Sequence, residues 1–156
     1  MGVFSDAICG PNATEAIGID KSQNEVKKGD VMFTISSETP DEVGMSSVWP
    51  GDEKNVYLNS FCFGFRPSPS ISSAFLAYVL RANAFRSRVR VLAQGISRYN
   101  ISKAKVMQIP ISVPTKEEQE RIGAYFCSLD TLIEQHGTQI QKLQQIKSAC
   151  LDEMFV

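Results

Sequence analysis

The chain has only one histidine and four cysteines, and it has no long apolar run. No two cysteines form a CxxC pair and His136 has no ligand residues at zinc spacing, so we expect no metal site. Free thiols are typical of a reducing compartment, which predicts a cytoplasmic location. No 18 consecutive residues are apolar, which excludes a transmembrane helix. Residues 1–10 lack a basic start and a long apolar core, so we expect no signal peptide there.

Motifs that carry chemistry are also missing. The sequence has no nucleophile elbow, no phosphate-binding glycine loop, no dinucleotide glycine motif and no paired carboxylates in its basic region. Its one histidine falls inside a long amphipathic stretch, a poor place for a catalytic triad. We therefore expect a protein that is not an enzyme and that holds no cofactor.

Acidic residues are absent from a long central segment. Residues 54–116 contain no Asp or Glu and ten Lys or Arg, whereas residues 1–53 contain ten acids and three lysines. A field of one sign attracts a polyanion, and phosphate contacts need such a field. The alternative is that these bases pair with the acids of the first third. The candidates for DNA contact are Arg81, Arg86, Arg88, Arg90, Arg98, Tyr99, Lys103 and Lys105, with Arg98 and Tyr99 favoured because they lie in a polar loop.

Several short apolar runs predict strands in the first half. Residues 31–35 form a β-prone run after a Lys-Gly-Asp turn signal, and residues 56–58 and 61–65 are similar. A further short strand is expected near residues 45–49, inside an acidic loop. Three aromatic residues alternate in the last run and predict a packed core face rather than a base-stacking platform. They are Phe61, Phe63 and Phe65.

Helical spacing takes over in the second half. Apolar residues recur at helical intervals over residues 70–92, where Asn83 can break the helix in two. Gln94 and Gly95 are expected to cap its end. Residues 103–107 form a short helical turn after Ser102. Residues 109–114 contain two prolines and must be extended.

The last segment predicts one long helix. Thr115 with Glu118 forms a capping box, and Glu117, Glu118 and Glu120 suit a helix N-terminus. A heptad seam comes next, interrupted by His136 and Lys147, and a helix so long needs a partner helix unless it lies on its own domain. The apolar seam residues expected at a dimer interface are Ile122, Phe126, Leu129, Ile133, Ile140 and Leu143. The predicted fold is α+β: a mixed α/β domain with a small twisted sheet over residues 1–114, then a long coiled-coil helix over residues 115–156.

Four segments, in order, resemble the DNA-specificity (S) subunits of type I restriction–modification enzymes. Residues 26–31 (VKKGDV) are similar to the family's strand-opening "kkGDi" segment, and residues 56–67 resemble the next stretch of the family's sequences. Residues 94–101 are similar to the "G-s-x-x-x-x-I" segment. The most specific part is residues 109–122, which resemble the "I-p-x-P-x-x-E-Q-x-x-I" boundary between recognition domain and spacer helix.

The resemblance implies a target recognition domain that docks on double-stranded DNA, followed by a spacer helix. In that family two such units form a subunit with antiparallel helices, and partner methyltransferase and restriction subunits use S-adenosylmethionine and ATP. This chain shows one unit, which predicts a half-subunit or a fragment that pairs with a second copy or another half. The family's usual "W-x-x-v-x-L-g-e-v" opening has no match in residues 1–25. The alternative function is a coiled-coil scaffold whose globular domain binds protein.

Overall fold

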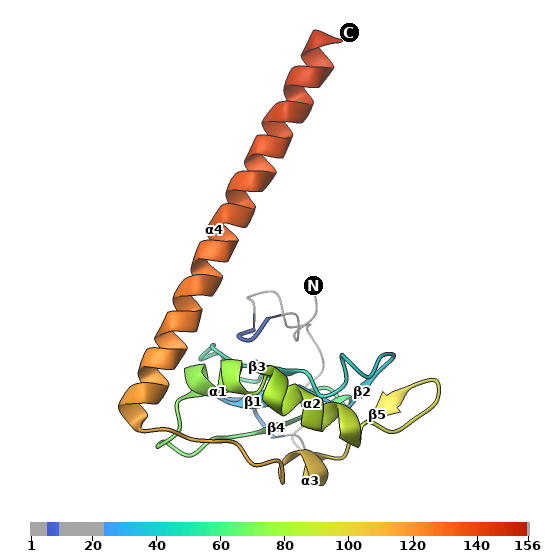
Figure 1. The fold of residues 1–156 in the computed structure, drawn as a ribbon, viewed down its shortest axis with the longest axis vertical. Helices are drawn as coiled ribbons and strands as arrows, with labels where there is room; N and C mark the ends of the chain where they lie inside the picture. Colours follow the sequence, from blue (N-terminus) through green and yellow to red (C-terminus); the bar gives the residue numbers. More distant parts are fainter. Residues whose placement is uncertain (1–5, 10–23, 156) are drawn as a thin grey trace. The chain divides into compact units, whose positions relative to one another are not determined.

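The structure is a computed structural model that describes residues 6–9 and 24–155. The expectation of little regular structure in residues 1–25 falls largely outside the described residues. The chain divides into two compact units, one ending at Gly123 and one beginning at Ala124. The first unit contains both small sheets and the short helices, and the second is the rest of the C-terminal helix (Figure 1).

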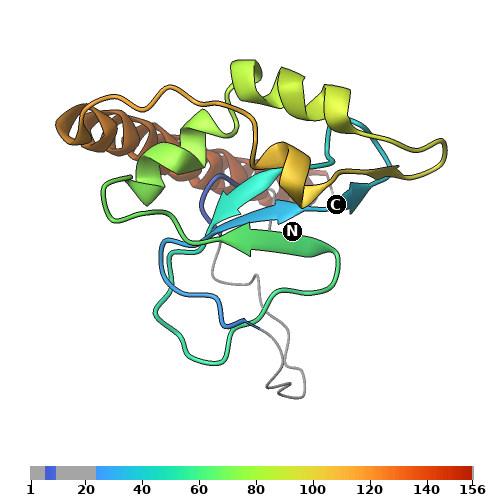
Figure 2. The same cartoon turned by 90° about the horizontal axis from the view of Figure 1, so that it is seen from below.

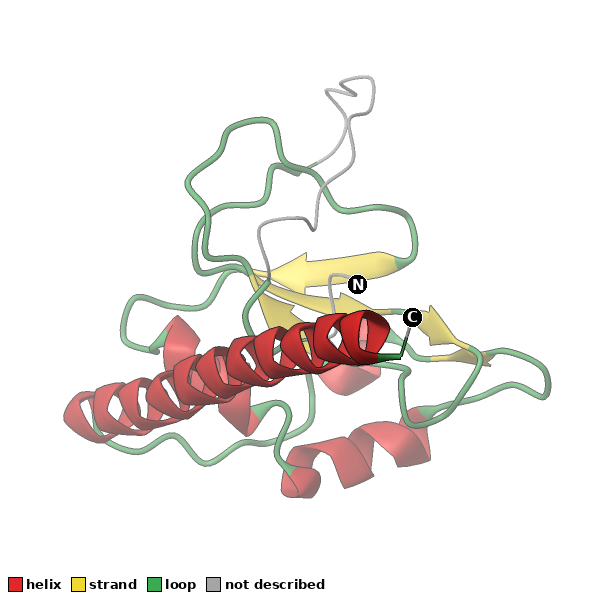
Figure 3. Ribbon diagram, turned by 90° about the horizontal axis from the view of Figure 1, so that it is seen from above, coloured by secondary structure: helices red, strands yellow, loops and turns green. Residues whose placement is uncertain are grey.

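Three antiparallel strands form the main sheet in the order β3-β1-β4. Strand β1 (Val31–Thr34) lies in the centre, between β3 (Ser46–Val48) and β4 (Cys62–Phe65). A second sheet has two short strands, β2 (Ser36–Ser37) and β5 (Tyr99–Asn100). Figure 3 shows the strands of both sheets in yellow. The strands expected near residues 31–35, 45–49 and 61–65 are thereby confirmed.

The strand expected at residues 56–58 does not form. Only Tyr57 pairs there, in an isolated bridge with Glu25. Val56 and Leu58 instead pack on a second small cluster of buried side chains, beside the sheet. Apolar packing outside the ladder explains why a β-prone run is not a strand here. The members of the cluster are Cys9, Val26, Met32 and Trp49.

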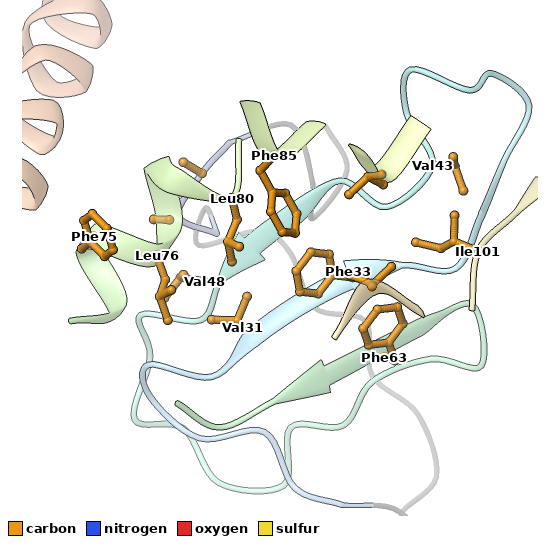
Figure 4. Close-up of a cluster of buried hydrophobic side chains, with 14 residues drawn as sticks. Val31, Phe33, Val43, Val48, Phe63, Phe75, Leu76, Leu80, Phe85 and Ile101 are labelled. Atoms are coloured by element: carbon orange, nitrogen blue, oxygen red, sulfur yellow. The ribbon is translucent and has the colours of Figure 1, made fainter. Parts of the chain in front are cut away.

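The predicted helix over residues 70–92 is two helices. Helix α1 (Ser73–Val79) begins after Ser72, whose hydroxyl accepts from the Phe75 N–H at 3.4 Å. Helix α2 (Asn83–Leu92) begins at the residue expected to mark the break. Side chains of both helices meet the main sheet, and Figure 4 shows Leu76, Leu80 and Phe85 facing strand residues. This interface is the core of the first unit.

The alternating aromatics divide between core and surface. Phe63 and Phe65 stack on Phe33 of β1, with ring centroids 5.1 and 6.3 Å apart. Phe61 comes just before β4 and is 59% exposed. The predicted core face is therefore confirmed for Phe63. Phe65 is only half-buried, and the prediction is wrong for Phe61, which is exposed. Phe61 lies in the turn before β4, and its carbonyl accepts from Ile35 N–H at 2.8 Å.

Two further helices complete the chain. Helix α3 (Lys103–Val106) follows Ser102 as expected, although the Ser102 side chain makes no capping hydrogen bond. Helix α4 (Lys116–Met154) is continuous through Gly137 (Figure 1). Its 39 residues give a length of about 58 Å at 1.5 Å per residue. None of the helices in the described part of the chain is both long and apolar enough to cross a membrane.

Candidate nucleic-acid interface

Arg86 serves the fold and does not face a ligand. It is 5% exposed, and its terminal nitrogens donate to the backbone carbonyls of Gly44, Asp41 and Val43 at 2.6, 2.7 and 3.0 Å. Burial lowers the pKa of its guanidinium, and the nearby charges of Arg90 and Arg81 act in the same direction. The expectation that Arg86 contacts DNA is therefore wrong, because both terminal nitrogens already donate to carbonyls of the 41–44 turn.

The other helical arginines are engaged inside the domain as well. Arg81 donates to the backbone carbonyls of Ser46 and Asp6 at 2.9 and 2.7 Å. Arg90 forms an ion pair with Asp41 at 2.6 Å. Arg66, which was not among the DNA candidates, pairs with Asp30 at 2.7 Å. The alternative in which bases pair with the acidic first third is confirmed for Arg66 and Arg90. Arg81 and Arg90 thus have partners inside the domain, and their contact with DNA stays a prediction.

Arg88 lies on the exposed side of α2. One of its terminal nitrogens donates to the Pro110 carbonyl at 2.9 Å. Pro110 belongs to the extended segment that connects α3 with α4, so Arg88 fastens this connection to the domain. This contact gives Arg88 a structural role that the sequence did not indicate.

A closed loop carries Arg98. Gln94 and Asn100 exchange two backbone hydrogen bonds of 3.0 and 2.8 Å, and this pair defines the 94–100 loop. Gly95 has φ +143, and a Cβ there would meet the Arg98 carbonyl oxygen. The glycine is therefore required by the loop itself. The expectation that Gln94 and Gly95 cap the helix is wrong, because α2 already ends at Leu92.

The 94–100 loop protrudes from the first unit, between α2 and β5 (Figures 1 and 2). Ile96 is 101% exposed at its tip. Arg98 is exposed too, and its Nε donates to Ser36 Oγ of β2 at 2.6 Å. Its Cζ lies 5.8 Å from the centroid of the Phe61 ring, within the range of a cation–π contact. An arginine, a serine and an exposed aromatic ring thus meet at one edge.

Lys103 lies over Phe63, the aromatic residue two positions after Phe61. Its Nζ is 5.9 Å from the Phe63 ring centroid and donates to the Gly64 carbonyl at 3.3 Å. Each of the two rings thus has a cation near it, Arg98 for Phe61 and Lys103 for Phe63. Lys105 is exposed on α3. We call Arg98, Lys103 and Lys105 the basic edge.

Tyr99 does not join the basic edge as an exposed group. It is half-buried in β5 and packs against the main hydrophobic core. Its ring stabilises the strand below the loop, and its expected contact with DNA stays a prediction. Sequence reasoning also missed Phe61 and Ser36. The signal that Phe61 differs from its partners was the polar pair Asn59 and Ser60 before it, which marks a strand end.

Specific hydrogen bonds define the boundary before α4. Thr115 and Glu118 form the predicted capping box: Glu118 N–H donates to Thr115 Oγ1 at 3.3 Å, and Thr115 N–H donates to Glu118 Oε2 at 3.1 Å. Gln119, the next residue, is 2% exposed. Its Oε1 accepts from Ser72 N–H at 2.8 Å and its Nε2 donates to the Pro114 carbonyl at 3.0 Å.

Gly123 lies one turn further along α4. A Cβ at this position would be 2.9 Å from Ala74 Cβ, so the glycine permits close packing of α4 on α1. The Glu-Gln pair of the boundary segment therefore has two separate roles. Glu118 caps the N-terminus of α4, and Gln119 attaches the first turns of α4 to the N-terminus of α1.

Beyond Gly123, the seam of α4 is exposed. Ile133 and Leu143 are 69% and 65% exposed, and Leu129 is half-buried. A second apolar column runs beside the seam and contains Tyr125, Leu132 and Ile146, all exposed. Apolar side chains are therefore exposed along much of this part of α4.

No metal site is found in the described ranges. Across residues 6–9 and 24–155, no three His, Cys, Asp or Glu side chains converge on a point that holds a metal ion. The basic edge presents positive charge, hydrogen-bond donors and an exposed aromatic ring, which are the kinds of group that contact a polyanion.

Solved structures share this fold. The chain is similar to the S subunit of a type I restriction–modification system from M. genitalium, with a TM-score of 0.53 and 19% identity. The likeness covers 72% of this chain and 28% of that chain. It establishes the architecture of an α+β domain with small antiparallel sheets followed by a long helix, as the sequence predicted.

The sequence then identifies the family. Residues 7–145 match the family described as type I restriction modification DNA specificity domain, and the chain belongs to it. A relative from Methanocaldococcus jannaschii, named as the specificity subunit of type I restriction enzyme MjaX, is 24% identical over 144 residues. That match covers 87% of this chain and 33% of the relative, so the chain spans about a third of the relative's length. The resemblance seen in the sequence is confirmed.

Proposed function

We propose that this chain recognises a DNA target for a type I restriction–modification complex, as one recognition unit of its specificity subunit. The observation that carries the proposal is the basic edge, where an exposed arginine is held on an exposed ring at the tip of a closed loop. Phosphate contacts set the register of such a domain, and base contacts in a groove supply sequence information. The complex acts in the cytoplasm, where its DNA lies.

The chain itself performs no chemistry in this proposal. By its family, methyltransferase subunits bring S-adenosylmethionine and restriction subunits bring ATP. The pure chain, incubated with DNA, Mg²⁺, ATP and S-adenosylmethionine, neither cleaves nor methylates. Turnover that copurifies with the chain through successive columns would contradict this assignment.

A salt titration tests DNA binding by the assembled complex. Each neutralised phosphate contributes about one unit to the slope of log affinity against log salt. Removing the charge with Arg98→Ala changes binding to duplex DNA if the basic edge touches it. An unchanged affinity and slope would remove Arg98 from the interface. A scaffold that binds only protein, the second candidate function, gives no salt-dependent DNA binding at all.

The seam of α4 pairs with a second copy or with another half-subunit in this proposal. Burying a Leu, Ile or Phe side chain contributes about 1.5–3 kcal/mol, so six of them contribute about 9–18 kcal/mol, which can outweigh the cost of association of roughly 4–15 kcal/mol. An antiparallel pair is favoured by charge, because Glu117 and Glu120 lie early while Lys142 and Lys147 lie late. Crosslinks between cysteines placed at Ile122 and Met154 of different copies form only in an antiparallel pair.

A further inference from the structure

Three segments far apart in the sequence converge on Arg98. The loop supplies the arginine, β2 supplies Ser36, and the residue before β4 supplies Phe61. The Nε–Oγ hydrogen bond is 2.6 Å, and Cζ lies 5.8 Å from the ring centroid. An exposed arginine on a surface normally samples many rotamers. Here two separate contacts hold one guanidinium in place.

The backbone beneath Arg98 is held as well. The paired backbone bonds of Gln94 and Asn100 close the loop, and the Asn100 side-chain nitrogen donates to the Arg98 carbonyl at 3.2 Å. Gly95 permits the tight return of the chain. Both ends of the arginine, its carbonyl and its guanidinium, are thus fixed by the fold.

The contacts leave one part of the guanidinium available. Within the described residues, the hydrogen bond of Arg98 uses Nε and the ring contact uses its flat face, while neither terminal nitrogen has a hydrogen-bond partner. Arg86 shows the contrast, since its terminal nitrogens donate to three carbonyls. The two terminal nitrogens of a guanidinium match the O6 and N7 acceptors of guanine in the major groove.

We propose that Arg98 reads a guanine in the DNA target, and that Phe61 and Ser36 are positioning residues that orient its guanidinium for this contact. The proposal rests on the proposed function and names the base and the residues that set it. A phosphate contact needs only a charge, and a mobile lysine provides one. A guanidinium that is already oriented loses less freedom on binding, which favours a contact that depends on geometry.

The nearest acid does not oppose this role. Ser37, next to Ser36 in β2, donates to the Glu42 carboxylate at 2.8 Å. Successive side chains of a strand point to opposite faces, so Ser36 faces Arg98 while Ser37 holds Glu42 on the other side. Ser36 thus gives Arg98 a hydroxyl acceptor, and Ser37 binds the Glu42 carboxylate on the other face.

The experiment reads the methylated motif in cells. The chain is produced with its methyltransferase subunits in a host that lacks other DNA methylation, and long-read sequencing reports the modified motif. Variants are Arg98→Lys, Phe61→Leu, Phe61→Tyr and Ser36→Ala. The matched control is Arg66→Lys, because Arg66 is paired with Asp30 and lies outside the basic edge.

The wild type gives one motif, and Arg98→Lys keeps every position of it except one G·C pair in each half-site that this chain reads, which becomes degenerate. Discrimination at that pair falls about 5- to 150-fold, the range for a lost bidentate base contact. Phe61→Leu relaxes the same pair more weakly, about 2- to 5-fold for loss of a cation–π contact. Ser36→Ala relaxes it by about 2- to 12-fold for loss of a hydrogen bond. Phe61→Tyr and Arg66→Lys retain the wild-type motif.

Three results would overturn the proposal, and they are distinguishable. An unchanged motif in Arg98→Lys removes the base contact but leaves the proposed function intact. Equal loss at every position in Phe61→Leu shows that Phe61 only supports the loop. A wild type that methylates no motif removes the proposed function itself, and the role of Arg98 with it.

Discussion

Replacing Gln119 with alanine tests the junction between the first unit and α4. The side chain is 2% exposed and makes two hydrogen bonds, one from Ser72 N–H and one to the Pro114 carbonyl. Alanine removes both bonds and leaves a backbone donor and a backbone acceptor without their partner. The first turns of α4 then lose their polar attachment to the N-terminus of α1.

The expected loss is set by these two contacts. Each intramolecular hydrogen bond contributes about 0.5–1.5 kcal/mol, and a buried group left unsatisfied costs about 1–3 kcal/mol. Alanine is the better helix former by a few tenths of a kcal/mol, which offsets little of this. We expect Gln119→Ala to lower the free energy of unfolding by about 2–4 kcal/mol.

Urea denaturation followed by circular dichroism measures the change. Gln145→Ala is the matched control, because Gln145 is exposed on the same helix and gains the same helix propensity without losing a contact. Both variants are compared at one protein concentration so that pairing of α4 affects them equally. If Gln119→Ala unfolds within about 0.5 kcal/mol of Gln145→Ala, the junction does not stabilise the domain as argued.

Three other outcomes are expected. Arg86→Met lowers the free energy of unfolding by about 2–4 kcal/mol in urea melts, since three carbonyls, two of them on buried residues, lose their donor; a change under 1 kcal/mol would contradict its structural role. Leu129→Glu turns a dimer into a 17.3 kDa monomer in sedimentation experiments; a wild type already monomeric at tens of micromolar would refute self-pairing. At pH 8, iodoacetamide modifies Cys62 far more slowly in the native protein than in urea, because burial raises the pKa of its thiol to about 11; equal rates would show that the thiol is not buried.

Local signals explain why much of the fold was predictable. The helix of 39 residues was predicted from a capping box and a heptad seam. Each of these features depends on residues that are only three or four positions apart in the sequence. The same holds for the break at Asn83 and for β1 after its turn. The run at residues 56–58 shows the limit, since burial against a separate cluster replaced pairing in the sheet.

The candidate site was less predictable, because charge does not tell which group a side chain meets. The acid-free segment indicated a basic surface, yet Arg86 donates to carbonyls of a turn more than 40 positions earlier in the chain. Arg98 was found because it lies in a polar loop. Phe61 and Ser36 were missed, since their meeting with Arg98 depends on strand pairing that no local pattern reports.

Deleting the gene tests target recognition by this chain in its own cell. The genome of the deletion strain is sequenced for modified bases beside that of the wild type, and the gene is then restored on a plasmid. We expect every copy of one specific motif to lose its methyl groups on deletion and to regain them on restoration. A methylation pattern that is identical in all three strains would contradict the proposal that this chain directs a modification complex to its target.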